Sequence, residues 1–189
     1  MRKIKLLLCA AALFMAGSSF LAADPLDFKN SVGVFILGNV TSETLSVKGI
    51  QYQRWCTDRW GFQTEGFVTY DAQSWQDSLP TYDFSLSGEV LLKLYETPKG
   101  YRFASTLYTW GLVGVHGFND VVYENFPNSS TGHYVDEGFM FNTVLGLGFG
   151  FDVMMLNHIS IPFQFGFEGE FPNKTSAGFC LGTGVRYKF

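Results

Sequence analysis

The sequence has few of the features that define several large protein classes. Only 3 of its 189 residues are cysteine, and one of them, Cys9, lies close to the N-terminus. The two that remain, Cys56 and Cys180, cannot make a disulfide-stapled scaffold. Lys and Arg (13) are outnumbered by Asp and Glu (17), which argues against nucleic acid as a partner. After the N-terminal segment, no apolar run approaches the roughly 18 residues of a spanning helix.

The N-terminal segment has the three parts of a secretory signal peptide. Residues 1–5 are basic, residues 6–16 are apolar, and small residues lead to Ala23. The apolar part has about 11 residues where a spanning helix needs roughly 20, so cleavage is favoured over a retained anchor. We predict a signal peptide over residues 1–23 and one domain over residues 24–189. Removing three basic residues leaves 10 against 17 acidic ones, a mature net charge of −7.

What the sequence has in abundance is aromatic residues and glycine, arranged with a period of two. Aromatics make up 17% of the chain, with 20 Phe and 9 Tyr, beside 21 Gly. In residues 159–171, Phe and Ile occupy mostly odd positions, while polar residues and glycine occupy mostly even ones. Residues 60–70, 82–94 and 139–153 repeat the alternation. This period is typical of β-strands that have one apolar face.

The alternation is compatible with a soluble antiparallel sheet or with a membrane barrel. The apolar face is large, aromatic and present on nearly every strand, and the opposite face mixes charges with glycine. The predicted fold is therefore all-β, an eight-stranded antiparallel up-and-down transmembrane β-barrel. A soluble lipocalin-like barrel with inward-facing Phe is the alternative. The predicted strands are 31–38, 44–55, 60–71, 82–96, 101–118, 139–155, 158–171 and 177–189.

Two of these strands have an undecided orientation. In residues 44–55 the alternation slips near Gly49, which suggests a β-bulge. In residues 101–118 both faces are apolar, so Tyr108, Trp110 and Leu112 could point either way. Connections after even-numbered strands are predicted to be short and those after odd-numbered strands longer, with the longest at residues 119–138. Such asymmetry is typical of outer-membrane barrels, with both termini in the periplasm.

The C-terminal strand carries a resemblance to a known family. Gly184, Tyr187 and the terminal Phe189 resemble the assembly signal at the end of bacterial outer-membrane proteins, with Gly182 in place of its usual polar residue. Together with length and strand count, the chain resembles the OmpA-like and OmpX-like superfamily of small barrels. The resemblance implies a multi-pass protein of the bacterial outer membrane, surrounded by its lipid. It also implies that the barrel-assembly machinery reads the last strand as an unpaired edge.

Charged residues on the inward face are expected to pair with each other. An eight-stranded barrel is just wide enough for side chains to fill, and an unpaired buried charge costs several kcal/mol. A structural ion-pair network is the favoured interpretation, and a gated ion path is the alternative. The predicted network comprises Glu65, Glu89, Lys93, Arg102, Glu168 and Arg186.

No catalytic, cofactor or metal site is predicted. His158 and Ser160, followed by Glu168 or Glu170, resemble the His-x-Ser pair of outer-membrane lipid A deacylases. However, ten residues of strand at about 3.3 Å each separate His158 from the second carboxylate. His116 and His133 accompany acidic residues of segment 119–138 without metal-ligand spacing.

The predicted function is that of a non-enzymatic outer-membrane barrel with a structural or surface-interaction role. Segment 119–138 also holds Tyr123, Phe126 and Tyr134, which could contact an extracellular partner. Cys56 and Cys180 are expected on opposite sides of the membrane, as free thiols. A small transport channel is the first alternative, and a lipid-modifying barrel enzyme is the second.

Overall fold

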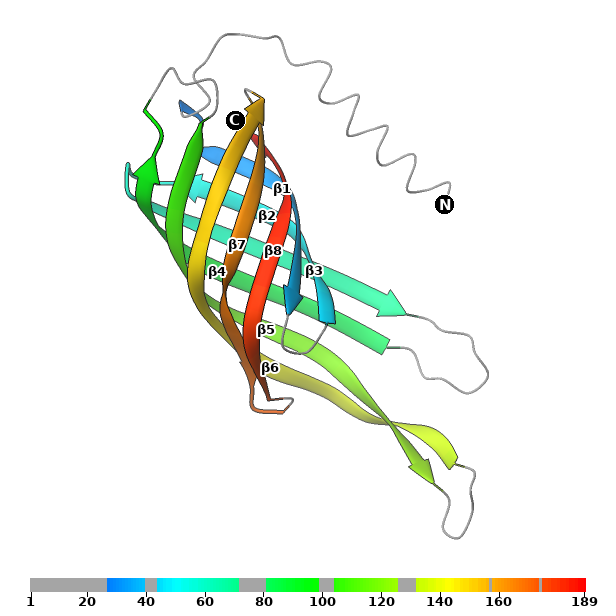
Figure 1. The fold of residues 1–189 in the computed structure, drawn as a ribbon. Helices are drawn as coiled ribbons and strands as arrows, with labels where there is room; N and C mark the ends of the chain where they lie inside the picture. The colour runs from blue at the N-terminus through cyan, green and yellow to red at the C-terminus, as the bar shows by residue number, and fades with distance from the viewer. Residues whose placement is uncertain are drawn as a thin grey trace, which may run out of the picture.

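The chain folds into a closed barrel of eight antiparallel strands in which each strand pairs with its sequence neighbours and β1 pairs with β8 (Figure 1). The computed structural model describes residues 27–39, 44–71, 81–98, 104–125, 132–156, 158–173 and 175–189. The predicted fold class is confirmed, while the predicted signal peptide, residues 1–23, lies outside the described residues. The strands are β1 (Asn30–Asn39), β2 (Thr44–Trp55), β3 (Trp60–Asp71), β4 (Thr81–Glu96), β5 (Ser105–Asn125), β6 (Gly132–Leu156), β7 (Ile159–Phe171) and β8 (Ser176–Lys188).

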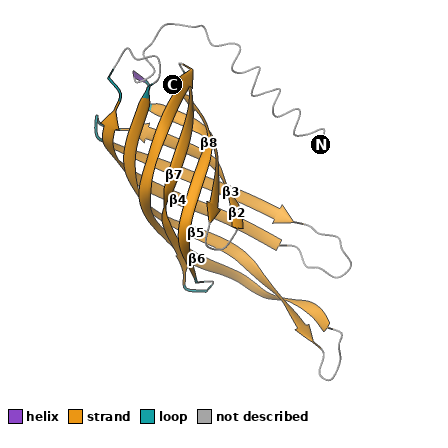
Figure 2. Cartoon of the chain, viewed as in Figure 1, coloured by secondary structure: helices purple, strands orange, loops and turns teal. Residues whose placement is uncertain are grey.

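Strands account for almost all regular structure in the described residues (Figure 2). Within that part of the chain, no helix has the length and apolar character needed to cross a membrane.

The barrel has its apolar side chains outside and its polar side chains inside. Leu147 on β6 and Val113 on β5 are 67% and 61% exposed, whereas Gln53 on β2 and Gln164 on β7 are almost fully buried. Strand geometry causes this separation, because successive side chains point to opposite faces of a sheet. The soluble alternative, with inward-facing Phe, is therefore wrong.

A β-bulge in β2 explains the slip in its sequence pattern. Phe35 of β1 pairs with Gly49, but the next residue, Ile36, pairs with Val47. Gly49 has a φ of 78°, and a Cβ there would lie 2.2 Å from the carbonyl oxygen of Gly66. Only glycine fits such a position easily. Beyond the bulge, Gln51 and Gln53 face the lumen.

The undecided face of β5 is settled by glycines on the neighbouring strands. Tyr108, Trp110 and Leu112 all point inward and are at most 5% exposed. The Trp110 ring lies against Gly148 of β6 and Gly166 of β7, which are register partners. Because these positions have no side chains, a large ring fits inside the barrel. Both faces of β5 are apolar since one meets the exterior and the other lies against the glycines of β6 and β7 inside the barrel.

The long connection predicted at residues 119–138 is mostly strand. β5 continues to Asn125, and β6 begins at Gly132, so the prediction of a long loop is wrong. The start of β5 is also later than predicted, at Ser105 instead of residue 101. Beyond the barrel wall, β5 and β6 form a two-stranded extension that is visible in Figure 1. We call its paired segments, residues 119–125 and 132–138, the β5–β6 arm.

Candidate functional site

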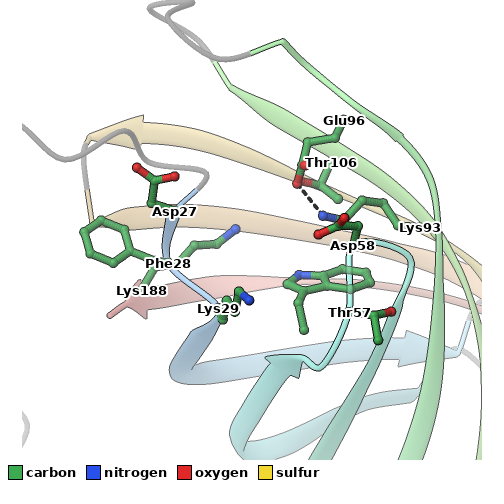
Figure 3. Close-up of a pocket in the computed structure, with 10 residues that line it drawn as sticks. Asp27, Phe28, Lys29, Thr57, Asp58, Lys93, Glu96, Thr106 and Lys188 are labelled. Atoms are coloured by element: carbon green, nitrogen blue, oxygen red, sulfur yellow. Dashed lines mark hydrogen bonds and ion pairs between the residues drawn. The ribbon is translucent and has the colours of Figure 1, made fainter.

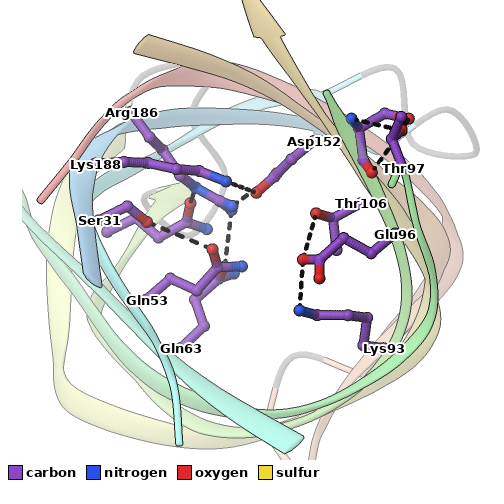
Figure 4. Close-up of polar contacts among 12 residues, drawn as sticks. Ser31, Gln53, Gln63, Lys93, Glu96, Thr97, Thr106, Asp152, Arg186 and Lys188 are labelled. Carbon is purple, nitrogen blue, oxygen red and sulfur yellow. Dashed lines mark hydrogen bonds and ion pairs between the residues drawn. The ribbon is translucent and has the colours of Figure 1, made fainter. Parts of the chain in front are cut away.

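The lumen holds a polar network centred on Arg186 of β8 (Figure 4). Its guanidinium donates to Asp152 Oδ1 at 2.9 Å, to Gln63 Oε1 at 2.7 Å and to Gln51 Oε1 at 2.6 Å. Lys188 Nζ lies 3.3 Å from the other carboxylate oxygen of Asp152. The Arg186 and Asp152 side chains are completely buried. These contacts join β2, β3, β6 and β8 across the inside of the barrel.

Two of the predicted acidic residues are held by neutral donors. Glu65 accepts hydrogen bonds from Gln51 Nε2 at 3.1 Å and from Ser87 Oγ at 3.2 Å. Glu89 accepts from Gln164 Nε2 of β7 at 3.1 Å, across the lumen. Hydrogen bonds to a carboxylate stabilise its charged form, so glutamine and serine supply part of the compensation that ion pairs were predicted to give.

A separate cluster surrounds Lys93. Its ammonium forms an ion pair with Glu96 at 2.5 Å and lies 4.7 Å from the centre of the Trp55 ring. Thr106 Oγ1 donates to the same Glu96 oxygen at 3.5 Å. In Figure 4 this group lies on the opposite wall from Arg186. Lys93 therefore has a local partner within its own strand.

Sequence reasoning found part of this arrangement. Of the remaining predicted members, Glu168 is partly buried on β7, and Arg102 lies outside the described residues. Asp152 of β6, the glutamines and Lys188 belong to the observed arrangement but not to the predicted set. The strand phase of Gln51, Gln53 and Gln63 was the signal that could have found them. A single ion-pair network through all six predicted residues stays a prediction.

The rest of the lumen contains an apolar cluster. Trp110 Nε1 donates to the carbonyl of Phe149 at 3.1 Å, so this indole buries its ring without losing its hydrogen bond. Cys180 belongs to the cluster as a buried cysteine, Cys56 is exposed, and neither forms a disulfide in the described part of the chain. The cluster consists of Phe35, Leu37, Trp55, Leu91, Tyr108, Trp110, Leu112, Val144 and Cys180.

A small cavity of about 170 Å³ opens at the end of the barrel where β1 begins and β8 ends (Figure 3). Its charged lining is balanced, with three lysines and three carboxylates. A polar cavity of this kind is suited to holding ordered water. Its lining residues are Asp27, Phe28, Lys29, Trp55, Thr57, Asp58, Lys93, Glu96, Thr106 and Lys188.

The residues that resemble a deacylase triad are not brought together. His158 Nδ1 lies 2.9 Å from the carbonyl oxygen of Lys188, and its ring stacks on Tyr187. Ser160 Oγ is buried in the lumen with no hydrogen-bond partner among the described residues. Glu170 instead contacts His116 of β5. A serine nucleophile needs a base within hydrogen-bond reach, which this arrangement does not supply.

No group of three or more His, Cys, Asp or Glu is arranged to hold a metal ion within the described ranges. His116 lies in β5, inside the strand and not in a loop. His133 belongs to the start of β6.

The C-terminal residues close the barrel. The Phe189 amide donates to the Asn30 carbonyl at 2.9 Å, and the Asn30 amide donates back at 3.2 Å. Gly184 pairs with Phe35, and a Cβ there would lie 2.2 Å from the Val34 carbonyl oxygen. Tyr187 and Phe189 stack with ring centres 6.4 Å apart. Recognition of Gly184, Tyr187 and Phe189 by the assembly machinery stays a prediction.

Fold and surface together define the class of protein. A closed barrel has no unpaired edge around its wall, so the backbone groups of its wall can be satisfied without water. Exposed Val, Leu, Ile and Phe side chains cover the outside, and the charged network lies within. The protein is a membrane-spanning eight-stranded β-barrel of the bacterial outer-membrane type.

Comparisons with known proteins give similarities of general architecture. No protein-family description matches the chain, and no curated protein is similar in sequence. The N-terminal β-barrel domain of Pseudomonas aeruginosa OprF is 13% identical with a TM-score of 0.45, over 85% of this chain and 97% of that one. Yersinia pestis Ail in a phospholipid bilayer nanodisc is 12% identical with a TM-score of 0.43, over 86% and 99%. Neisserial surface protein A is 10% identical with a TM-score of 0.39, over 85% and 95%.

Proposed function

We propose that the protein is a non-enzymatic surface-interaction protein whose β5–β6 arm contacts an extracellular partner while side chains fill the lumen. The arm is the observation that carries this proposal. The β4–β5 register ends at Asp83 and Phe118, and the β6–β7 register ends at Thr143 and Phe171. The β5–β6 register continues to Asn125 and Gly132. The outer part of the arm thus has two strands and no third strand paired to it in the described part of the chain.

The arm favours partners that bind through their main chain. A strand at the edge of a sheet presents N–H and C=O groups to which another extended segment can pair. Residues 119–138 contain four acidic residues and neither Lys nor Arg. The acidic charge opposes a polyanionic partner such as a sulfated sugar. An extended protein segment bearing basic side chains is the partner that this chemistry fits best.

The residues inside the barrel support the proposal that side chains fill the lumen. The Arg186 network and the apolar cluster that includes Trp110 are both built from buried, inward-facing side chains. An eight-stranded barrel encloses little more space than its own side chains need. We therefore infer a structural role for the interior in place of a transport channel. The separation of His158, Ser160 and Glu170 supports the view that the barrel is not a lipid-modifying enzyme.

Deleting residues 121–135 tests the role of the arm. Joining the cut ends through an Asn-Gly turn should leave the barrel folded, because neither β4 nor β7 pairs with the removed residues. The probe is a synthetic peptide of alternating valine and lysine, whose binding to the reconstituted protein is measured by surface plasmon resonance. We expect binding to the full chain and loss of binding after the deletion.

A peptide of the same length and charge, in which proline replaces each valine, is the control, because proline cannot donate to a strand ladder. Shortening the segment between β3 and β4, residues 72–80, should leave binding intact. Equal binding to the armless and full-length proteins would rule out the arm as the contact element.

A further inference from the structure

Four polar side chains from four consecutive strands meet inside the barrel at the end from which the arm extends. They are Asp83 of β4, His116 of β5, Asn142 of β6 and Glu170 of β7. His116 and Asn142 are register partners, two residues before the β4–β5 register ends at Phe118. This group, which we call the mouth cluster, therefore lies at the root of the arm.

His116 bridges two carboxylates. Its Nε2 lies 2.8 Å from Asp83 Oδ1, and its Nδ1 lies 2.9 Å from Glu170 Oε2. A neutral imidazole has one N–H donor, and an ionised carboxylate can only accept. With both carboxylates ionised, both contacts can be hydrogen bonds at the same time only if the ring carries two protons and a positive charge. The geometry thus fits an imidazolium held between two anions.

The bridge joins strands that are not neighbours. β5 and β6 separate β4 from β7 in the barrel, so the His116 side chain connects them across the mouth. Asn142 extends the cluster, donating to Glu170 at 3.5 Å and accepting from the Asn173 amide at 2.9 Å. The Asn173 side chain in turn donates to the Phe141 carbonyl at 2.7 Å. These contacts connect the segment after β7 to the mouth cluster.

We propose that His116 is a pH-sensitive clasp that holds the outer ends of β4, β5 and β7 together at the root of the arm. When the ring loses a proton, one nitrogen presents a lone pair to a carboxylate, and that contact becomes repulsive. Among the residues whose side chains the structure describes, the charged groups in contact with the ring are Asp83 from β4 and Glu170 from β7. β6 contributes the neutral Asn142 and β5 the aromatic Phe118. The clasp is therefore closed while the ring is charged and both carboxylates are ionised, and it opens as the pH rises and the ring loses a proton. This inference does not depend on what the arm binds.

Nuclear magnetic resonance of the full-length barrel in detergent micelles tests the protonation state directly. At neutral pH, both ¹⁵N ring signals of His116 should be those of protonated nitrogens. His158 contacts one backbone carbonyl and no carboxylate that the structure records, so it is the internal comparison. A neutral His116 ring at neutral pH overturns the proposal.

Hydrogen exchange tests whether the clasp holds the mouth. Between about pH 5 and pH 10, protection of the Phe118 and Phe171 amides should fall on the order of ten-fold after correction for intrinsic exchange, whereas that of Tyr108 should not. In His116→Gln the two amides should exchange rapidly throughout, without a pH step. His158→Gln should behave as the unsubstituted protein does.

Asp83→Asn provides a second variant, because it removes one carboxylate and leaves the imidazole in place. Asp83→Asn should reduce the pH-dependent change in amide protection without abolishing it, since Glu170 still faces Nδ1 of His116. A pH step of equal size in His116→Gln and the unsubstituted protein contradicts the clasp, as does a flat profile in the unsubstituted protein.

Discussion

Replacing Arg186 by Ala is expected to destabilise the barrel by about 3–5 kcal/mol, because the substitution leaves a buried carboxylate without its main partner. Asp152 is completely buried, and its other recorded ion-pair partner is Lys188, at 3.3 Å. Gln51 and Gln63 also lose the donor that their side-chain oxygens accept from. Equilibrium urea unfolding in lipid bilayers measures the loss.

A double variant separates loss of charge compensation from loss of volume. Arg186→Met with Asp152→Leu removes both charges and keeps apolar bulk, which often restores stability when a buried pair is replaced whole. The double variant should therefore be more stable than Arg186→Ala. Lys29→Ala, at an exposed position, is the matched control and should change stability little. A cost below about 1 kcal/mol for Arg186→Ala would show that the network does not compensate Asp152 as described.

Substituting Val for Gly148 is expected to cost about 3 kcal/mol or more by overpacking the lumen. A Cβ at this position would lie 2.2 Å from the Phe165 carbonyl oxygen and 2.7 Å from the Trp110 ring. The backbone contact cannot be relieved by a rotamer change, and the ring is held by its bond to Phe149. Unfolding in the same bilayers gives the difference in stability.

Gly111 of β5 is the matched control for Gly148. It lies on the exposed face, and a Cβ there meets nothing within 4 Å. Gly111→Val adds the same apolar atoms toward lipid and should be neutral or slightly stabilising. Equal destabilisation by the two substitutions would contradict the assignment of inward and outward faces.

The barrel could be predicted from the sequence because the alternation within each single strand shows which of its faces is apolar. An alternation of Phe with Gly or polar residues defines which face of a strand meets lipid, and β7 follows this rule along nearly its whole length. The bulge at Gly49 could also be expected, because the alternation changes phase there. β5 was undecided because both its faces are apolar, and only the glycines of β6 and β7 explain where Trp110 fits.

Contacts across the lumen could not be predicted in the same way. Arg186 is 123 residues from Gln63 in sequence, and their contact depends on register through several strands. His116 was grouped with the acidic loop because charge and proximity in sequence suggested it. In the barrel, register places it between Asp83 and Glu170 instead. The sequence did not predict the β5–β6 arm as strand, because its residues do not show the apolar alternation of the barrel wall.

Planar-bilayer recording of the purified protein is the measurement that tests the account most directly, since it asks whether side chains fill the barrel. We expect no discrete current steps above those of the bare bilayer, because the side chains of the Arg186 network and the Trp110 cluster point into the lumen. Regular single-channel steps that Glu89→Ala abolishes would contradict it and identify the protein as a small channel.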